Sequence, residues 1–438
     1  LTGTYLIVRG NGRKTPYFLI EGSVTLTSAL VFVALFTMRG KTVDLFPLFS
    51  DLEIGFHIDG LGLGFAGLVA FLWPFAILYA IEYMEDDHRQ DGFFGFYVLT
   101  YGITLGIAYA KNLPTLYFFY EMLTMVTFPL VLHYRDRSSR SAAREYLYYS
   151  MGGAAFAFIG LVFTIIYGST TDFTLGGVFD LASLGDKKSL LLVVLVMAFF
   201  GFGIKAAVFP FHKWLPEASV APTPVTALLH AVAVVKAGAF AITRLVYYIY
   251  GPEFLRSSWV YYILYAFVLM TIAYGSTMAV REIHFKRRLA YSTIANLSYI
   301  VLGIIMLSGE GMKAGILHLF IHALMKITAF YCAGAVMEKA HRHYVYELDG
   351  LGRKMPVTFV CFTIAGCSLM GVPLFGGFVS KWFLAEAMVQ NGSWMGILGI
   401  VVLLYSAAMT AIYMMTVTVR AFFPPKGFDY STLEGIHD

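Results

Sequence analysis

The stretch GFGIKAAVFPFHKWLPEASVAPTPVTALLHAVAVVKAGAFAITR, residues 201–244, places two lysines in apolar surroundings on either side of a proline-rich break. Proline removes a backbone donor and clashes with the preceding helical turn, so a helix that enters at Lys205 cannot run unbroken to Lys236. A charged side chain at the centre of a membrane helix costs about 2.5–3.5 kcal/mol. Two lysines beside a broken helix therefore indicate part of an ion path, and the remaining chain would be its frame.

The composition is that of a polytopic membrane protein. The chain has 438 residues, of which 58% are hydrophobic and 13% charged, whereas soluble domains contain about 25% charged residues. The net charge of +4 follows membrane sidedness and does not indicate a nucleic-acid partner. Cys332, Cys361 and Cys367 lie in apolar stretches and form no C-x-x-C pair. This spacing argues against disulfides, zinc and iron–sulfur ligation, and favours buried small side chains.

Apolar runs long enough to cross a bilayer predict an all-α protein with about twelve transmembrane helices. The runs are 17–38, 60–82, 93–110, 112–133, 146–168, 189–209, 223–249, 258–279, 289–307, 311–337, 357–389 (interrupted) and 395–421.

Basic residues in the loops predict that both termini of this chain are cytoplasmic. One set of alternate loops contains Arg13, Lys14 and the basic runs 135–144 and 281–288, and the opposite set contains few Lys and Arg. The simplest interpretation of the two runs is a topology signal. An anionic partner surface is the alternative.

Two predicted spans are interrupted and resemble each other. KAAVFPFHKWLPEA (205–218) and CSLMGVPLFGGFVSKWFLAEA (367–387) each contain a proline, an irregular stretch, Lys-Trp and an alanine-flanked glutamate. They lie five spans apart, so they cross in opposite directions, which is typical of inverted repeats with ion sites near the breaks. The predicted parts are N-terminal helices (1–92), a first five-helix repeat (93–249), a second (258–421) and a C-terminal tail (422–438).

Buried ionisable residues are the candidate ion-translocation residues. Glu121 lies near the middle of the fourth span, where a carboxylate needs a cation or a proton, and Lys205 is its natural partner. The alternative is a glutamate satisfied by helix partners with no transport role. Lys236 lies at the centre of the seventh span, too deep to reach an interface, and a buried lysine can exchange a proton. His230 suits a relay, or is a hydrogen-bonded core histidine.

The tenth span contains His318, His322 and Lys326 at intervals of four residues, which places them on one helix face. Two histidines at this spacing can bind a metal, but no acidic third ligand is nearby, so a polar stripe along a hydrated path is favoured. Lys381 follows the second break and would face an exit or the next module. Asp59 is a helix N-cap or a transport residue. The sequence contains no recognised catalytic motif.

These residues resemble the antiporter-like membrane subunits shared by Mrp-type sodium/proton antiporters, respiratory complex I and membrane-bound hydrogenases. The most specific stretch is 205–244, supported by HIDGLGLGF (57–65), RRLAYSTIANLSYIVLGI (287–304), HLFIHALMKITAF (318–330) and GVPLFGGFVSKW (371–382). In that family a glutamate, here Glu121, pairs with a lysine on a broken helix, here Lys205. A central lysine, matching Lys236, and a lysine on the second broken helix, matching Lys381, continue a hydrated axis.

The resemblance implies a proton- or sodium/proton-translocating subunit of a multisubunit complex, in the cell membrane and in contact with other antiporter-like and small membrane subunits. Lys381 in place of glutamate is similar to the D-type Mrp or hydrogenase-associated pattern. Family members usually have fourteen helices, so the first and last helices would be missing here. We expect no cofactor in this chain; iron–sulfur clusters, flavin or nickel would belong to partner subunits. The alternatives are a non-transporting membrane anchor of a redox complex and a stand-alone secondary transporter.

Overall fold

The computed structural model describes residues 1–9, 15–49, 52–182 and 184–438. Arg13 and Lys14, which entered the orientation argument, lie outside the described residues. The chain groups into two compact units. Unit 1 comprises Leu1–Ala206 and Val220–Leu264, and unit 2 comprises Ala207–Ser219 and Tyr265–Asp438.

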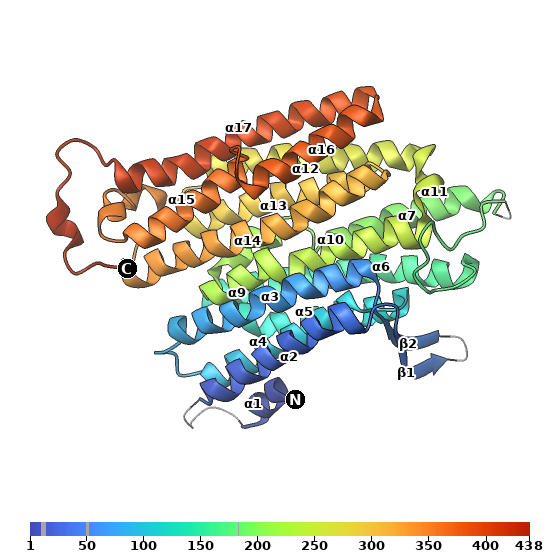
Figure 1. The fold of residues 1–438 in the computed structure, drawn as a ribbon, viewed down its shortest axis with the longest axis horizontal. Coiled ribbons are helices and arrows are strands. Elements are labelled where there is room, and N and C mark those ends of the chain that lie inside the picture. Colours follow the sequence, from blue (N-terminus) through green and yellow to red (C-terminus); the bar gives the residue numbers. More distant parts are fainter. Residues whose placement is uncertain (10–14, 50–51, 183) are drawn as a thin grey trace. The chain divides into compact units, whose positions relative to one another are not determined.

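Unit 1 is a bundle of helices with one short hairpin (Figure 1). Its elements are α1 (Thr2–Arg9), α2 (Tyr17–Thr37), β1 (Thr42–Phe49), β2 (Leu52–His57), α3 (Gly60–Tyr83), α4 (Gln90–Ala108), α5 (Leu113–Val131), α6 (Arg137–Tyr167), α7 (Lys187–Gly203), α9 (Thr223–Ala227), the π-helical turn η2 (Leu228–Val232), α10 (Val234–Arg244), the π-helical turn η3 (Leu245–Tyr250) and α11 (Pro252–Arg256).

Unit 2 contains the second group of long helices. The helix α12 (Trp259–Arg281) begins in unit 1 and continues into unit 2. The other elements are α8 (Trp214–Glu217), α13 (Phe285–Ile305), α14 (Gly309–Lys339), α15 (Pro356–Met370), α16 (Gly376–Asn391), α17 (Trp394–Phe422) and the short 3-10 helices η1 (Ala218–Val220, whose last residue belongs to unit 1), η4 (Val345–Glu347), η5 (Leu351–Arg353) and η6 (Tyr430–Leu433).

Side-chain caps fix where several long helices begin. A cap oxygen accepts one of the amide hydrogens that the first turn of a helix cannot satisfy, and this contributes about 1 kcal/mol. Asp59 caps α3, Asn112 caps α5 and Asp136 caps α6, with oxygen–nitrogen distances of 2.8, 2.9 and 2.7 Å. Ser308 and Ser393 cap α14 and α17 in the same way. The N-cap interpretation of Asp59 is therefore confirmed.

The predicted transmembrane architecture is confirmed. Within the described residues, nine helices are long and apolar enough to cross a membrane. The other predicted spans correspond to α5, to α7 and to the pair α15 and α16 (Figure 1). The division into two inverted five-helix repeats stays a prediction.

Both predicted breaks occur, but the first begins earlier than the prolines imply. Helix α7 ends at Gly203, so Lys205 lies in a turn beyond the helix and not inside it, and Ala207 has a φ of 54°. Pro210 therefore prevents the helix from resuming and does not itself end it. The second break separates α15 from α16, and Gly371 adopts a left-handed conformation there, with φ of 86°.

The sequence analysis did not predict the hairpin β1–β2 (Figure 1). The strands pair antiparallel, with Val43 opposite Phe56. The side chains of Val43, Leu45 and Phe46 are about half exposed, so this hairpin lies at the surface of unit 1. The fold is otherwise helical in the described residues.

Candidate functional site

In unit 1, the turn after α7 brings Lys205 against α5 next to Glu121. Lys205 is 2% exposed, and its Nζ donates to the carbonyl of Tyr120 and lies 3.5 Å from the centroid of the Tyr120 ring. The Lys205 charge interacts electrostatically with the Glu121 carboxylate. Oε1 of Glu121 is buried and has no hydrogen-bond partner among the described residues. Lys205 and Glu121 are therefore close, as predicted, but the Lys205 ammonium donates to the main chain of Tyr120, the residue before Glu121.

Close backbone packing connects this turn to the helix that carries Lys236. A Cβ atom on Gly238 of α10 would lie 2.5 Å from the Ala206 nitrogen and 2.8 Å from the Lys205 carbonyl carbon. Real Cβ atoms do not approach that closely, so the contact requires glycine. Lys205 and Lys236 are thereby positioned through two directly touching backbone segments.

A π-helical turn positions Lys236. The turn η2 contains His230, and its i→i+5 hydrogen bonding changes which carbonyls are used within the helix. Lys236 Nζ donates to the His230 carbonyl oxygen at 3.2 Å. Both side chains are fully buried. Because π-helical turns occur frequently at functional sites, this local departure from α geometry supports the choice of Lys236 and His230 as candidates.

In unit 2, the α14 stripe forms as predicted. His318, His322 and Lys326 are all fully buried, and the two imidazole rings stack with centroids 5.9 Å apart. One ring nitrogen of His318 contacts Ser380 Oγ at 2.8 Å and the other contacts Asn296 Oδ1 at 3.2 Å. Lys326 Nζ donates to the Leu289 carbonyl at 3.0 Å. The stripe is therefore a buried polar network between α13, α14 and α16.

The second break seats Lys381 on the end of the preceding helix. Lys381 of α16 donates to the carbonyls of Leu369 and Met370 at 2.6 and 3.3 Å. These are the last carbonyls of α15, whose partial negative charge favours a cation. The Lys381 ammonium also lies 5.3 Å from the centroid of the Tyr299 ring.

The candidate lysines share one feature: each donates to a main-chain carbonyl. Lys205 and Lys236 belong to unit 1, and Lys326 and Lys381 belong to unit 2. The Lys-Trp resemblance between the two breaks does not extend to burial, because Lys213 is exposed and Lys381 is buried. The short sequence match therefore pairs Lys213 with Lys381, although the two side chains lie in different environments.

Sequence reasoning missed the partner of Asp59. Arg244 donates two hydrogen bonds to the Asp59 carboxylate, at 2.6 and 2.7 Å, and is 1% exposed. Burial acts to raise the pKa of Asp59, but the hydrogen bonds and charge of Arg244 outweigh it and lower the pKa. The two residues lie 185 positions apart. The only signal in the sequence was an arginine inside a predicted span.

The basic run 281–288 does not lie wholly in a loop. Its interpretation as a topology signal stays a prediction, but α13 begins at Phe285 and buries Lys286 and Arg288, which are 3% and 6% exposed. Arg288 donates to the carbonyls of Glu282 and Tyr413, at 2.9 and 3.2 Å. These two side chains therefore contribute to the packing of unit 2. The arginines of the run 135–144 are exposed, and its interpretation as a topology signal also stays a prediction.

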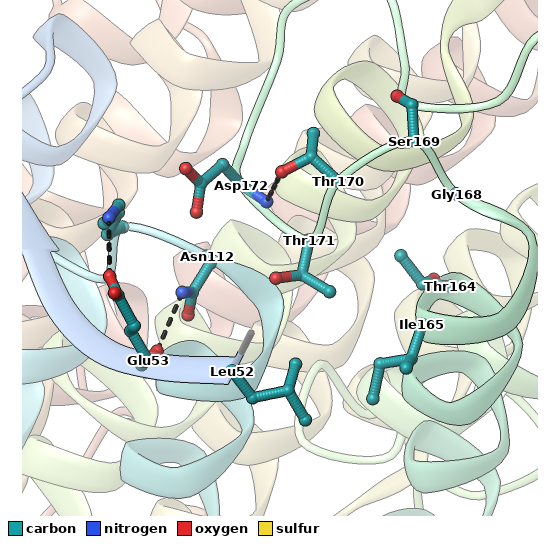
Figure 2. Close-up of a pocket in the computed structure, with 11 residues that line it drawn as sticks. Leu52, Glu53, Asn112, Thr164, Ile165, Gly168, Ser169, Thr170, Thr171 and Asp172 are labelled. Carbon is teal, nitrogen blue, oxygen red and sulfur yellow. Dashed lines mark hydrogen bonds and ion pairs between the residues drawn. The ribbon is translucent and has the colours of Figure 1, made fainter. Parts of the chain in front are cut away.

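A polar pocket of about 600 Å³ opens in unit 1 at the start of α5 (Figure 2). Carboxylates of Glu53 and Asp172, the Asn112 amide and the hydroxyls of neighbouring threonines line it. Lys111 at its edge donates to Asp44 and Glu53, at 2.8 and 3.2 Å. The hydrogen bond to Asp44 is the main cause of the raised pKa of Lys111. No part of this pocket was anticipated from the sequence.

Metal ligands do not assemble in the part of the chain that the structure describes: no group of three or more His, Cys, Asp or Glu side chains there could hold an ion. The candidate residues instead supply the buried amines of lysines, the imidazoles of histidines and the carboxylate of Glu121, which are groups that exchange protons.

Comparison with known proteins gives two matches to family models. Residues 110–410 match the family described as NADH:quinone oxidoreductase/Mrp antiporter, TM. Residues 49–94 match NADH-Ubiquinone oxidoreductase (complex I), chain 5 N-terminus.

Among individual proteins, the chain is 32% identical over 428 residues to a Na(+)/H(+) antiporter subunit from Alkalihalophilus pseudofirmus, covering 91% of this chain and 52% of that protein. It is 32% identical over 431 residues to NADH-quinone oxidoreductase subunit N of Desulforudis audaxviator, covering 95% of this chain and 83% of the relative. The chain thus spans about half the length of the antiporter relative.

Solved structures have the same fold. A chain of the Mrp complex from Dietzia sp. matches with a TM-score of 0.84 at 22% identity, covering 98% of this chain and 79% of that one. A chain of the membrane-bound sulfane sulfur reductase, an archaeal respiratory membrane complex, matches with a TM-score of 0.82 at 22% identity, covering 97% and 86%. Together with the family match over residues 110–410, these findings show that the chain belongs to the NADH:quinone oxidoreductase/Mrp antiporter transmembrane family.

Proposed function

We propose that this multi-pass membrane protein is an antiporter-like subunit that translocates protons, or protons and sodium, within a multisubunit membrane complex. The observation that carries the proposal is the set of buried lysines, each of which donates to a neutral main-chain carbonyl. A carbonyl stabilises an ammonium less than a carboxylate does, so such a lysine can release its proton inside the protein. The relatives' names support the same function, since they are subunits of a Na(+)/H(+) antiporter and of an NADH-quinone oxidoreductase.

The mechanism we propose is electrostatic. Unit charges about 5 Å apart at an effective dielectric constant of about 20 interact by about 3 kcal/mol, enough to change a protonation equilibrium by about two powers of ten. Movement of the Glu121 carboxylate away from Lys205 would remove such a favourable interaction and promote proton release from Lys205. The released proton would pass toward Lys236, and His230 would relay it. The proposed path continues through His318, His322, Lys326 and Lys381 in unit 2.

Water and ions would reach Glu121 from the polar pocket. Asn112 lines that pocket and caps α5, and Glu121 lies further along the same helix, at 1.5 Å per residue about 13 Å away. The basic-residue pattern predicts this end to be extracytoplasmic, in the cell membrane. Redox cofactors such as iron–sulfur clusters, flavin or nickel would belong to partner subunits, and the D-type pattern of Lys381 stays a prediction.

The test is ion transport by the native complex reconstituted in vesicles, with a pH-sensitive dye inside. Lys236→Ala should abolish proton flux while the complex still assembles. Lys313→Ala, which removes a lysine whose side chain is 75% exposed, is the matched control and should transport normally. Unchanged flux in Lys236→Ala would reject the proposal. A purely structural anchor predicts instead that Glu121→Gln and Lys205→Met leave energy conservation untouched, and a stand-alone transporter would transport when purified without partners.

The assembly is identified by measuring iron, nickel and flavin in the native complex. Stoichiometric iron would indicate a redox-driven pump, with nickel indicating a hydrogenase arm and flavin an NADH-oxidising arm. Absence of all three from an intact particle would indicate an antiporter driven by the ion gradients.

A further inference from the structure

Two neighbouring cavities in unit 1 share Arg135, and one is lined mainly by arginines while the other has an apolar wall. The first, about 840 Å³, is open and lined by Arg135, Asp136, Arg137, Arg140, Ser141 and Arg144. The second, about 120 Å³, has an apolar wall and is lined in part by Arg89 and Arg135. We propose that this place binds one anionic phospholipid, with its phosphate on the arginines and the first methylenes of one acyl chain in the apolar groove.

The arginine cluster is positioned by the start of α6. Arg137, Arg140 and Arg144 recur at intervals of three and four residues, which places them along one helix face. All three are exposed. The acidic residue in the cluster, Asp136, is engaged as the cap of α6, with Oδ1 2.7 Å from the Ser139 nitrogen. The cluster therefore presents a net positive charge to its surroundings.

Arg135 is held in a costly backbone conformation at the junction of the two cavities. Its φ is 56°, in the left-handed region, which asparagine and glycine adopt more readily than arginine. Such conformations concentrate at functional sites, where the side chain is needed for another reason. The arginine side chain at this position is the feature that the two cavities share.

The groove lies between the first turns of α4 and the last turns of α5. Phe93 and Phe96 of α4 and Pro129 and Leu130 of α5 supply apolar walls. Gly92 supplies open space, because a Cβ built on it would meet no atom within 4 Å. The two helices are antiparallel neighbours, so the groove opens at the end of the bundle where the arginines lie.

Charge complementarity selects the occupant. Four arginines beside the ends of membrane spans lie where phosphates of anionic lipids lie, and basic clusters of this kind recognise anionic head groups. A zwitterionic lipid offers the same phosphate but brings a positive group with it. An apolar groove next to the cluster adds a place for an acyl chain, which a soluble phosphate lacks. Burial of methylenes in that groove makes the lipid the better ligand.

The experiment is native mass spectrometry of the full chain, or of its complex, in detergent, with added phosphatidylglycerol, phosphatidylcholine or inorganic phosphate. We expect retention of phosphatidylglycerol in preference to phosphatidylcholine. Arg135→Asn combined with Arg140→Gln should weaken phosphatidylglycerol binding about 25-fold, or about fivefold for each arginine removed. Asparagine suits the backbone at 135, and both side chains are exposed, so this variant should fold.

A second variant tests the groove. Gly92→Phe fills the open space and should also weaken phosphatidylglycerol binding, although every arginine remains. Arg256→Gln combined with Lys313→Gln removes two exposed charges elsewhere and should bind like the unmodified chain.

Three results would overturn the proposal. One is equal binding of the two lipids by the unmodified chain. Another is displacement of phosphatidylglycerol by inorganic phosphate together with normal lipid binding in Gly92→Phe, which would mean a simple anion site. The third is unchanged lipid binding in the arginine variant with impaired assembly of the complex, which would mean an acidic protein partner.

Discussion

Replacement of Asp59 by asparagine isolates the charge of the ion pair with Arg244. Asparagine can still cap α3 by accepting from the Gly62 amide, a bond of 2.8 Å in the structure. What disappears is the negative charge opposite a guanidinium that is 1% exposed. Removal of one partner from a buried pair costs about 3–5 kcal/mol because the remaining charge is left uncompensated.

Aromatic neighbours of Arg244 place the expected loss of stability near the lower end of this range. The guanidinium of Arg244 lies 4.6–5.1 Å from the ring centroids of Phe173, Phe240 and Tyr248, and these rings attract a cation even without Asp59. We therefore expect Asp59→Asn to lower the free energy of unfolding by about 3 kcal/mol at pH 7. Asp59→Asn combined with Arg244→Met should recover most of this loss, since the double variant buries no unpaired charge.

The pH dependence follows from the lowered pKa of Asp59. The unfolded-state pKa of an aspartate is about 3.9, so the stabilisation by the ion pair is fully present above that pH. It is lost as the pH falls through the lower pKa of the folded state. The difference in stability between the unmodified chain and Asp59→Asn should therefore be constant near neutral pH and shrink below about pH 4.

The assay is denaturant unfolding of the detergent-solubilised chain, followed by far-ultraviolet circular dichroism. The reasoning is refuted if Asp59→Asn unfolds at the same denaturant concentration as the unmodified chain at pH 7. It is also refuted if the double variant is less stable than Asp59→Asn alone.

Two further predictions concern the packing around the candidate lysines. Gly238→Val should displace the turn at Lys205, because its Cβ would lie 2.5 Å from the Ala206 nitrogen, and proton flux in reconstituted vesicles should fall sharply. The control is Gly152→Val, whose Cβ would meet no atom within 4 Å. Equal flux in the two variants would contradict the role of the contact. Ser380→Ala removes the 2.8 Å hydrogen bond to His318 and should lower the free energy of unfolding, measured with denaturant, by about 0.5–1.5 kcal/mol. The same substitution at the exposed Ser138 should change the free energy of unfolding little. Unchanged stability in Ser380→Ala would mean that the network around His318 is not formed.

The sequence was most informative where one signal had one structural cause. Long apolar runs correspond to helices because a backbone inside a bilayer must satisfy its own hydrogen bonds. Prolines and glycines marked both breaks, and the intervals of four residues in α14 correctly placed His318, His322 and Lys326 on a buried face. Lys205 was found near a break for the same reason, although the helix ends before it, at Gly203.

Features that depend on distant partners could not be predicted. The hairpin β1–β2 is local in sequence, but strand propensity depends on packing against neighbours, so the strands were also not predicted. Arg244 meets Asp59 only because α10 packs in unit 1. Lys286 and Arg288 lie in a basic run whose composition is that of a loop signal, but α13 buries them. The π-helical turn at His230 has no local signature, because its residues, LLHAV, are equally compatible with an ordinary α-helix.

The carbonyl acceptors of the candidate lysines have a consequence for how this protein is studied by mutation. Tyr120, His230, Leu289 and Leu369 each contribute their peptide oxygen, and an alanine at any of these positions would supply the same atom. A scan of side chains across the whole chain would therefore detect the lysines, and at Tyr120 and His230 the loss of the ring, but it would not detect the carbonyls that hold the ammonium groups. Replacement of the peptide bond itself by an ester at the residue that follows would weaken each oxygen as an acceptor without altering any side chain.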